Sequence, residues 1–406
     1  MRPRPIARLC LNTEVLAGPG AFEACLRECP PGTVALVDGG LPRVEEVADS
    51  LARRGIPARR LAGDIGVSTV RAAIDWARGR SAPAAHLVAV GGGSTIDVAK
   101  LAAALLASGG ELDSLTGRAG LLMLPALPNP PTPRVGVTAV PTTVGTATEV
   151  SAVACVDLSV GRRTLVQSPR LRPVRAGLDP VLVETLPRAL IREGALEALF
   201  RALGPEVGSD SSVALAGVEA RFLIGELSGQ LTRLADPGAE YPTAAHEIAC
   251  LSLTTQRGWT MSGRDPYAHP LWYVANELSM ITGVAKMRAT AALFGGWVAR
   301  VRAGDRRWGH LGRLSRVWAA ITDTVPLSEL GARHLLHGWR IENRIAAVDP
   351  AHVAELTTAR CLERWGGRFP MLGGMDVDDL TDLVRTAVRA TGAIPAAGAE
   401  VRSEAR

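Results

Sequence analysis

Three consecutive glycines, between an apolar run and a segment of helical character, are the feature of this chain with the clearest chemistry. Gly91, Gly92 and Gly93 follow the apolar residues 87–90, and a segment of helical character follows at 98–106. Glycine lets the backbone approach an anion closely, and a helix start offers free N–H groups and the positive end of its dipole. The spacing fits neither the G-x-G-x-x-G fingerprint nor the G-x-x-x-x-G-K-[ST] loop. We therefore predict a phosphate-binding turn of another kind.

A second block, PTTVGTATEVS at residues 141–151, follows in the same half of the chain. The two blocks in this order resemble the iron-containing alcohol dehydrogenase family, which shares its fold with dehydroquinate synthase. Shorter motifs agree with the resemblance: ALVD at 35–38, LDP at 178–180, AHPL at 268–271 and GVA at 283–285. The resemblance extends over roughly residues 5–300. It implies a dehydrogenase that uses NAD(P).

The resemblance also implies where the dinucleotide would bind. The glycine block would hold the pyrophosphate, and an aspartate in the following helix would lie near the nicotinamide ribose. Threonines of the second block would line the adenine and ribose side, and an arginine stands where the family has a lysine. The implied contacts are Gly92, Gly93, Ser94, Asp97, Thr142, Thr143, Thr146 and Arg163.

Asp38 bears on the choice between NAD and NADP. It ends the apolar run of residues 34–37, where the family has the acid that hydrogen-bonds the adenosine ribose. A carboxylate that accepts two ribose hydroxyls repels a 2′-phosphate, so we expect NAD to be preferred over NADP. The alternative is an acid that only stabilises the turn after the strand.

The metal site of the family has been replaced at each of its ligand positions. In the family an Asp and a His one helical turn apart supply two ligands, and two further histidines flank the A-H-P-L motif. The corresponding positions here are Glu197, Arg201, Asp265 and Thr282. A guanidinium has no lone pair to give and stays protonated, so Arg201 cannot be a ligand. We therefore predict a protein without a catalytic metal.

Arg201 is our candidate for the cation that takes the place of the metal. We predict that it is buried and held by Glu197, one helical turn before it, and by Asp265 from a neighbouring helix. It would polarise a substrate carbonyl or bind a substrate carboxylate through both terminal nitrogens. The alternative is an exposed pair, worth only a few tenths of a kcal/mol.

His269 keeps its family residue in the A-H-P-L motif. In relatives this histidine lies beside the nicotinamide and the substrate, and it is not a primary metal ligand. Imidazole titrates near neutral pH without help, so we predict that His269 is the general acid or base. A purely structural histidine is the alternative.

Together these residues indicate a metal-independent oxidoreductase that uses NAD to oxidise a hydroxyl next to a carboxylate, in a small molecule or a peptide. Relatives serve natural-product pathways, including oxidative decarboxylation of ribosomal peptide C-termini (daptide type), and the resemblance extends to that role. One alternative is a sugar-phosphate cyclase of the dehydroquinate synthase type. The other is a non-catalytic NAD-binding partner in a biosynthetic complex.

Composition narrows the class of protein. The 406 residues are 47% hydrophobic and 21% charged, typical of a globular protein. The net charge is +5, yet arginines are scattered among acids and aromatic residues make up only 4%, which argues against nucleic-acid binding. Arginine supplies all but two of the 45 basic residues, which indicates a GC-rich bacterial genome; the exceptions are Lys100 and Lys286.

The chain carries no signal for export, a membrane or structural zinc. No secretory segment opens it, no apolar run is long enough to span a bilayer, and its six cysteines lack zinc spacing. We therefore expect a cytoplasmic protein that binds no membrane. We also expect a homodimer, with a partner biosynthetic protein as a further option.

Two kinds of segment must position these residues. Apolar runs at 34–37, 87–90, 135–140 and 152–156 alternate with helical patterns at 44–54 and 70–78, which predicts a parallel sheet covered by helices. After Asp179 the strand signals stop and long Ala- and Leu-rich segments follow. We predict a Rossmann-like α/β nucleotide-binding domain over residues 1–177 and an all-α catalytic domain over residues 178–406. Together they form the fold of dehydroquinate synthase and the iron-containing alcohol dehydrogenases.

Overall fold

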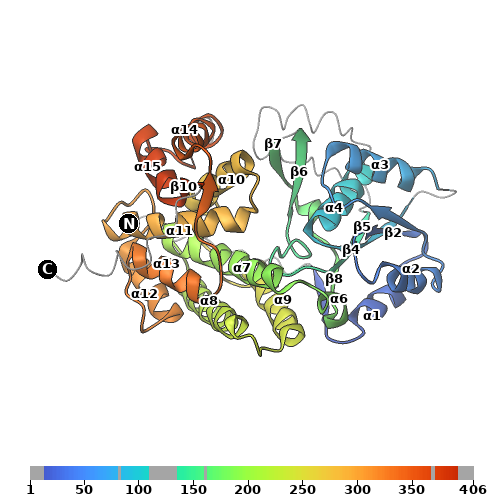
Figure 1. The fold of residues 1–406 in the computed structure, drawn as a ribbon. Helices are drawn as coiled ribbons and strands as arrows, with labels where there is room; N and C mark the ends of the chain where they lie inside the picture. The colour runs from blue at the N-terminus through green and yellow to red at the C-terminus, as the bar shows by residue number, and fades with distance from the viewer. Residues whose placement is uncertain (1–12, 81–83, 109–134, 160–161, 367–370, 392–406) are drawn as a thin grey trace.

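A parallel β-sheet forms the core of the N-terminal half (Figure 1). The computed structural model describes residues 13–80, 84–108, 135–159, 162–366 and 371–391. Within these residues the sheet has six strands in the order β1-β8-β5-β4-β2-β3. They are β1 Glu14–Ala17, β2 Thr33–Asp38, β3 Ala58–Leu61, β4 His86–Gly91, β5 Gly136–Pro141 and β8 Arg175–Leu178. All neighbouring pairs are parallel, as the sequence predicts.

Helices cover both faces of this sheet. They are α1 Ala21–Arg27, α2 Val44–Ala52, α3 Val67–Arg78 and α4 Gly93–Ser108. Alternate residues of a strand point to opposite faces. Accordingly, Val34 and Leu36 of β2 pack in one core with α3 and α4, whereas Ala35 and Val37 pack in another with α1 and α2. Because both faces are buried, the central strands are continuous apolar runs in the sequence.

A separate hairpin stands between the sheet and the helical half (Figure 1). Its strands, β6 Val153–Ser159 and β7 Arg162–Gln167, pair with each other in antiparallel fashion. The sequence analysis counted residues 152–156 among the strands of the parallel sheet, and the structure corrects this. Antiparallel neighbours need only a short turn, so β6 and β7 pair without the crossover helix that a parallel strand requires. The short η1, Pro169–Leu171, then leads to β8.

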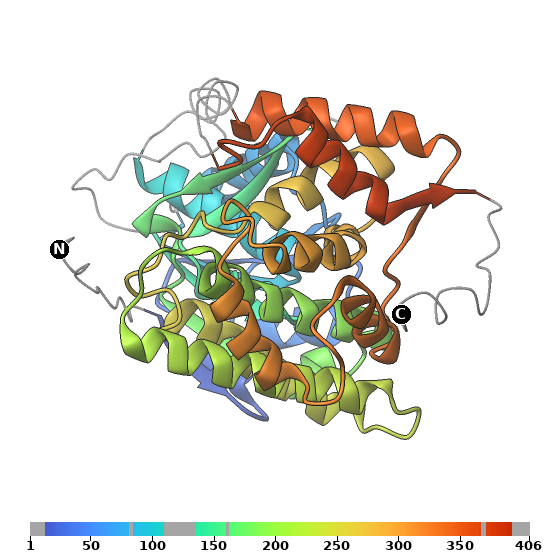
Figure 2. The ribbon, with the colours of Figure 1, turned by 90° about the vertical axis from the view of Figure 1, so that its left-hand side faces the viewer.

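The C-terminal half is helical, and the predicted fold class is confirmed. Its helices are α6 Pro180–Val183, α7 Arg188–Gly208, α8 Ala214–Ala235, α9 Tyr241–Arg257, α10 Pro270–Thr282, α11 Lys286–Arg302, α12 Leu311–Ile321, α13 Glu329–Gly338, α14 Pro350–Cys361, η2 Leu362–Gly366 and α15 Val377–Ala387. Figure 2 shows α14 and α15 lying over α10 and α11. One departure from an all-helical domain is a parallel pair of short strands, β9 Ile345–Ala347 and β10 Val388–Ala390.

Helix α7 joins the two halves. Gly145, in the loop after β5, has φ 103°, and a Cβ atom there would lie 2.3 Å from the Cα of Gly194 in α7. At the start of the helical half Asp179 caps α6 through the N–H of Val181 and also accepts the N–H of Phe22 in α1. These contacts fix the loop of residues 142–151 against the helical half.

None of the helices in the described ranges is long and apolar enough to cross a membrane. The proline-rich residues 119–133 and the C-terminal tail, which the sequence suggests are irregular, lie outside the described residues.

Candidate functional site

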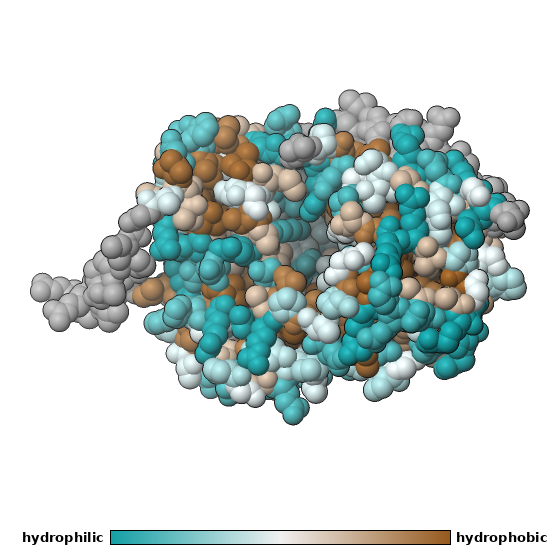
Figure 3. All heavy atoms as spheres, turned by 45° about the vertical axis from the view of Figure 1, so that its right-hand side comes forward, coloured by the Kyte–Doolittle hydropathy of each residue, from teal (hydrophilic) through white to brown (hydrophobic). Residues whose placement is uncertain are grey.

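A cavity of about 540 Å³ lies where the two halves meet. Its walls come from the start of α4, the loop after β5 and the β6–β7 hairpin on one side, and from α7, α10 and the start of α11 on the other. The chemically active side chains on its surface are Ser94, Asp97, Thr146, Cys155, Arg163, Glu197, Arg201, His269, Tyr273 and Lys286. Figure 3 shows the molecular surface hollowed between the two halves. The cavity is within the range of small-ligand sites.

The glycine block forms a turn with no room for side chains. A Cβ atom on Gly91 would lie 2.7 Å from the Cβ of Thr95 and 2.8 Å from that of Asp38. The hydroxyl of Thr95, in the first turn of α4, is buried and has no hydrogen-bond partner within the described residues. The turn therefore brings the end of β2 and the start of α4 together with backbone exposed between them.

The second sequence block closes over this turn. The N–H of Thr142 donates to the carbonyl of Gly91 at 3.0 Å. A Cβ on Gly92 would lie 3.3 Å from Thr143 Cγ2, and a Cβ on Gly93 would lie 3.1 Å from Thr146 Cγ2. The structure thus brings together the two blocks that the sequence analysis assigned to one dinucleotide. The cradle fits a pyrophosphate, because added side chains would fill it and its helix presents free N–H groups.

Asp38 lies beside the cradle at the end of β2. Its Oδ1 accepts the N–H of Gly40 at 2.9 Å, so it stabilises the turn after the strand. Its second oxygen leaves acceptor capacity for a ligand hydroxyl. The structure is therefore compatible with both roles considered for this residue, and its part in cofactor choice remains a prediction.

Asp97 is buried and belongs to a network that the sequence analysis missed. Lys100, fully buried, donates to Asp97 Oδ1 at 3.1 Å and to Thr148 Oγ1 at 2.7 Å, and also to the carbonyls of Thr148 and Val153. Asp97 Oδ2 accepts the N–H of Cys155 at 2.9 Å. The network ties α4 to the loop after β5 and to the hairpin. A lone lysine in an otherwise apolar helix was the available signal.

Arg163 lies on the hairpin wall of the cavity. Its guanidinium forms a two-pronged pair with Asp157 on the neighbouring strand, with Nε–Oδ1 at 2.6 Å and Nη2–Oδ2 at 2.9 Å. The pair raises the pKa of Arg163, which therefore stays charged. The predicted position at the cofactor side is compatible with this placement, but much of its hydrogen-bonding capacity is used within the hairpin.

Arg201 is buried, as predicted, and is held chiefly by the nucleotide half. Its Nη2 donates to the carbonyls of Gly145 and Thr146, and its Nη1 donates to Thr255 Oγ1 at 3.1 Å. Glu197 is a partner, with Oε1 3.4 Å from Nη2. Burial lowers the pKa of Arg201, and the nearby Glu197 and Glu149 oppose that effect.

Two parts of the Arg201 hypothesis need correction. Asp265 does not hold Arg201: it is exposed, and its carboxylate accepts the N–H of Tyr267 at 2.8 Å. The loop before α10 turns this side chain outward. Both terminal nitrogens of Arg201 are also occupied by protein acceptors, so they do not offer a free fork to a substrate carboxylate. Arg201 therefore anchors the loop after β5 to α7.

The donor set at the family's ligand positions does not fit a transition metal. Thr282 ends α10 with its hydroxyl donating back to the carbonyl of Leu278 at 2.7 Å. Asp265 points away, and Arg201 cannot ligate, which leaves Glu197 as the one carboxylate of the set that lines the cavity. Across the described ranges, no cluster of three or more His, Cys, Asp or Glu side chains could hold a metal ion.

His269 lies on the cavity wall, with its ring 4.7 Å from that of Trp272, centroid to centroid. Gly204 of α7 makes room for it: a Cβ there would lie 2.1 Å from the imidazole. Neither ring nitrogen has a hydrogen-bond partner among the described residues. Burial, helped by the charge of Lys286, lowers the pKa of His269 to about 3. The ring is therefore neutral at physiological pH, so a proton-donating role for it is disfavoured.

Lys286 is a cavity residue that the sequence analysis did not identify as functional. It is the first residue of α11, and its ammonium lies 4.4 Å from the centre of the Trp272 ring. Burial lowers its pKa, as do the charges of Arg201 and Arg163, whereas Glu197 opposes the shift. The signal in the sequence was its rarity, since the chain has only one other lysine.

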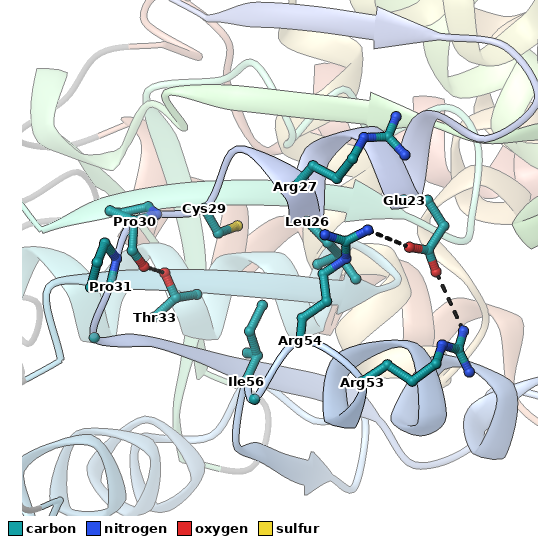
Figure 4. Close-up of a pocket in the computed structure, with 12 residues that line it drawn as sticks. Glu23, Leu26, Arg27, Cys29, Pro30, Pro31, Thr33, Arg53, Arg54 and Ile56 are labelled. Carbon is teal, nitrogen blue, oxygen red and sulfur yellow. Dashed lines mark hydrogen bonds and ion pairs between the residues drawn. The ribbon is translucent and has the colours of Figure 1, made fainter.

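A second cavity, of about 600 Å³, lies at the opposite edge of the sheet, before the starts of β2 and β3 (Figure 4). Arg53 and Arg54 both point to Glu23, at 3.7 and 3.4 Å. Ligands of open α/β sheets bind at the carboxyl ends of strands, where the first cavity lies. We therefore take the cavity between the halves as the functional site.

Comparison with known sequences finds matches in the first half of the chain. The model of the iron-containing alcohol dehydrogenase family matches residues 12–180. Phosphonoacetaldehyde reductase of Streptomyces viridochromogenes is 43% identical over 113 residues, which is 28% of each chain. 4-Hydroxybutyrate dehydrogenase of Cupriavidus necator is 37% identical over 123 residues, or 30% of each chain. These matches span less than a third of the relatives' length.

Comparison with solved structures extends the likeness to the whole fold. NADH-dependent butanol dehydrogenase A from Thermotoga maritima superimposes with a TM-score of 0.78 at 18% identity, over 95% of this chain and 99% of that one. A 1,3-propanediol oxidoreductase superimposes with a TM-score of 0.74 at 18% identity, over 94% and 100%. At such identities the likeness establishes the fold, and it includes the helical half.

Proposed function

We propose that the chain is a nicotinamide-dependent oxidoreductase of the iron-containing alcohol dehydrogenase type that interconverts a hydroxyl and a carbonyl group. The family model matches residues 12–180, and the fold of a solved dehydrogenase extends over the helical half. The observation that carries the proposal is the meeting of the glycine turn and the threonine block beside the cavity. Relatives of the first half are named as dehydrogenases and reductases, which supports the reaction class.

The cofactor we propose is NAD. The turn of Gly92 and Gly93 and the hydroxyl of Ser94 would hold its pyrophosphate, and Asp38 would accept hydroxyls of the adenosine ribose. When bound, the nicotinamide supplies or accepts a hydride. Asp38 favours NAD over NADP because its charge opposes a 2′-phosphate.

We further propose that the reaction proceeds without a catalytic metal. The support is the chemistry of the donor set: a guanidinium, a hydroxyl bound to its own helix, an outward-facing Asp265 and the single inward-facing carboxylate of Glu197. Such a set offers too few lone pairs to hold Fe²⁺ or Zn²⁺ at the four- to six-coordination these ions adopt. The chain must then supply positive charge at the reacting oxygen from its own side chains.

The substrate class we propose is a hydroxy acid or the corresponding carbonyl compound. Two relatives are named for substrates with an anionic group, 4-hydroxybutyrate and phosphonoacetaldehyde. The cavity wall carries two basic side chains, the buried Arg201 and the half-buried Lys286. Peptides ending in a β-hydroxy acid are the larger members of this class and correspond to the natural-product role.

The test combines binding, turnover and metal content. NADH binding is measured by fluorescence. Turnover is then followed by nicotinamide absorbance with simple alcohols, hydroxy acids, aldehydes and peptides that end in a hydroxy acid, in the presence of a chelator. Metal is quantified by mass spectrometry. Net formation of reduced nicotinamide by metal-free protein supports the proposal. Activity that requires added Fe²⁺ or Zn²⁺ contradicts metal independence.

The same experiment separates the alternatives. A sugar-phosphate cyclase regenerates its cofactor and would give no net reduced nicotinamide. A protein that binds NADH but turns over none of these compounds would be the non-catalytic partner. We also propose a homodimer, to be checked by light scattering coupled to size-exclusion chromatography; a predominantly monomeric peak would contradict it.

A further inference from the structure

The Lys286 side chain differs from the other cations around the cavity. It is half-buried, it lines the cavity, and its ammonium lies over the face of the Trp272 ring, 4.4 Å from the ring centre. Within the described ranges no protein oxygen accepts a hydrogen bond from its ammonium. An ammonium carries three donors and needs acceptors when it leaves water. Its donors are therefore available to a ligand in the cavity.

The neighbouring cations are already bound to protein acceptors. Lys100 donates to Asp97, Thr148 and Val153, and Arg163 is paired with Asp157. Arg201 donates through both terminal nitrogens to the loop after β5 and to α9. Among the described residues that line the cavity, Lys286 is thus the cation whose donors the protein leaves free.

The charges around Lys286 suit a group that gives up and regains a proton. Burial, together with Arg201 from α7 and Arg163 from β7, disfavours the charged form and outweighs the opposing effects of Glu197 from α7 and Cys155 from β6, so the pKa lies below that of an ordinary lysine. Burial lowers the pKa of His269, before α10, to about 3, so this ring carries no imidazolium proton to give near neutral pH. A lysine with a lowered pKa is an effective acid or base closer to neutral pH.

We propose that Lys286 binds the reacting oxygen of the substrate and moves its proton, the task that a metal ion and its bound solvent would otherwise share. The inference rests on the proposed function. In the reducing direction a bound reduced nicotinamide would supply the hydride to the carbonyl carbon. The Lys286 ammonium gives one proton to the oxygen, leaving a neutral amine and an alcohol. Solvent then returns the proton. In the oxidising direction the amine accepts the hydroxyl proton.

Substitutions of Lys286 distinguish proton transfer from the alternative role of binding a substrate carboxylate. We expect Lys286→Met to lower kcat about 100-fold or more with both neutral and acidic substrates. Lys286→Arg keeps the charge but cannot release a proton, so it should restore substrate binding without restoring kcat. Arg288→Met, on the same helix but outside the cavity lining, is the matched control and should retain wild-type kinetics. A rise in KM confined to acidic substrates, with kcat unchanged, would overturn the proposal.

A second measurement does not depend on turnover. The chain has only two lysines, and Lys100 is fully buried and paired with Asp97. Reductive alkylation with acetaldehyde and cyanoborohydride, mapped by peptide mass spectrometry, should therefore modify Lys286 before Lys100. Its rate should rise with pH to a midpoint below the ordinary lysine value of about 10.4. Saturating NADH and a substrate analogue should slow it.

The two measurements separate the two possible failures. An unreactive Lys286, or one with an ordinary midpoint, overturns the lysine inference even if NAD-dependent turnover is observed. A reactive, low-midpoint Lys286 in a protein that neither binds NADH nor forms reduced nicotinamide would instead contradict the proposed function.

Discussion

The two walls of the cavity are built in different ways. The nucleotide wall includes closely packed backbone at Gly91, Gly92 and Gly93, where added Cβ atoms would meet Thr95, Thr143 and Thr146. The helical wall consists of side chains projecting from α7, α10 and α11, including Arg201, His269 and Lys286.

This difference is consistent with a sequence match that is confined to one half. Closely packed backbone needs glycine at fixed positions, because any side chain there would fill the space that glycine leaves open to a ligand. A wall of side chains can change one residue at a time while the helices that carry it keep their packing. Accordingly, the family model matches only residues 12–180, whereas the fold of a solved dehydrogenase covers 95% of the chain.

The largest effect should come from removing the side chain that links the two walls. Arg201→Met would remove the donors to Gly145 and Thr146 and leave the carboxylates of Glu197 and Glu149 without their nearest cation. We expect the free energy of unfolding to fall by about 3 kcal/mol. Urea denaturation measures this. The matched control, Arg192→Met on the same helix, should change it by less than about 0.5 kcal/mol. A stable variant that loses only substrate affinity would show that Arg201 binds substrate.

The nucleotide wall should be intolerant of side chains. Gly92→Asp would place a carboxylate in the cradle assigned to the pyrophosphate, so we expect NADH affinity to fall about 100-fold, or ~2.7 kcal/mol. Calorimetry on the folded variant would measure it. Gly312→Asp is the control, because that glycine is exposed with no atom within 4 Å of its added Cβ. Unchanged affinity in Gly92→Asp would place the dinucleotide elsewhere.

Lowering the pH should reduce the free energy of unfolding, because each half of the chain contains one buried histidine. Burial lowers the pKa of His86, in β4, to about 4 and that of His269 to about 3. Both are neutral when folded and titrate near 6.5 when unfolded, so the unfolded state binds more protons as the pH falls below 6.5. Between pH 7 and pH 5 we expect each to reduce the free energy of unfolding by roughly 2 kcal/mol.

The comparison is made by unfolding in urea at both pH values. His86→Gln and His269→Gln should each remove about half of the combined decrease in unfolding free energy that the two histidines cause between pH 7 and pH 5. His86 has a partner in Thr138 at 2.8 Å, whereas His269 has none in the described residues. Equal pH dependence in wild type and His269→Gln would mean that this ring is accessible to protons in the folded state.

The smallest effect concerns cofactor choice. Asp38→Asn would remove the charge that opposes a 2′-phosphate but keep an acceptor for Gly40. We expect the ratio of kcat/KM for NADPH to that for NADH to rise about tenfold, ~1.4 kcal/mol. Asp49→Asn, an exposed acid on α2, is the control. No change in the ratio would leave Asp38 with the turn-stabilising role alone.

Sequence reasoning succeeded where a residue type has one physical meaning in its context. Apolar runs predicted the parallel strands, and glycines predicted the turn that meets Thr143 and Thr146. It failed where the direction of a side chain decides the outcome. Asp265 has the right type and spacing to reach Arg201, but its loop turns it toward Tyr267.

Two other features could not be read from local pattern. The predicted acid or base, His269, is neutral because the whole helical core excludes water from it, and burial by distant segments has no local signature. Lys286 was noticed only as a rare residue, because nothing in the sequence shows that its amine faces a cavity without a protein acceptor. Both properties arise from the packing of helices distant in sequence.

The contact between Gly145 and Gly194 is also useful when this sequence is compared with others. A methyl group at Gly145 would overlap the backbone of Gly194, and a methyl group at Gly194 would overlap the carbonyl of Val144, the residue before Gly145, so the docking of the two halves constrains both positions at once. A substitution at one cannot be offset by shrinking the other, because neither has a side chain to lose. Glycine at both positions, one in each half of the chain, is therefore a sequence marker for this docking of the two halves, and another sequence can be checked for it.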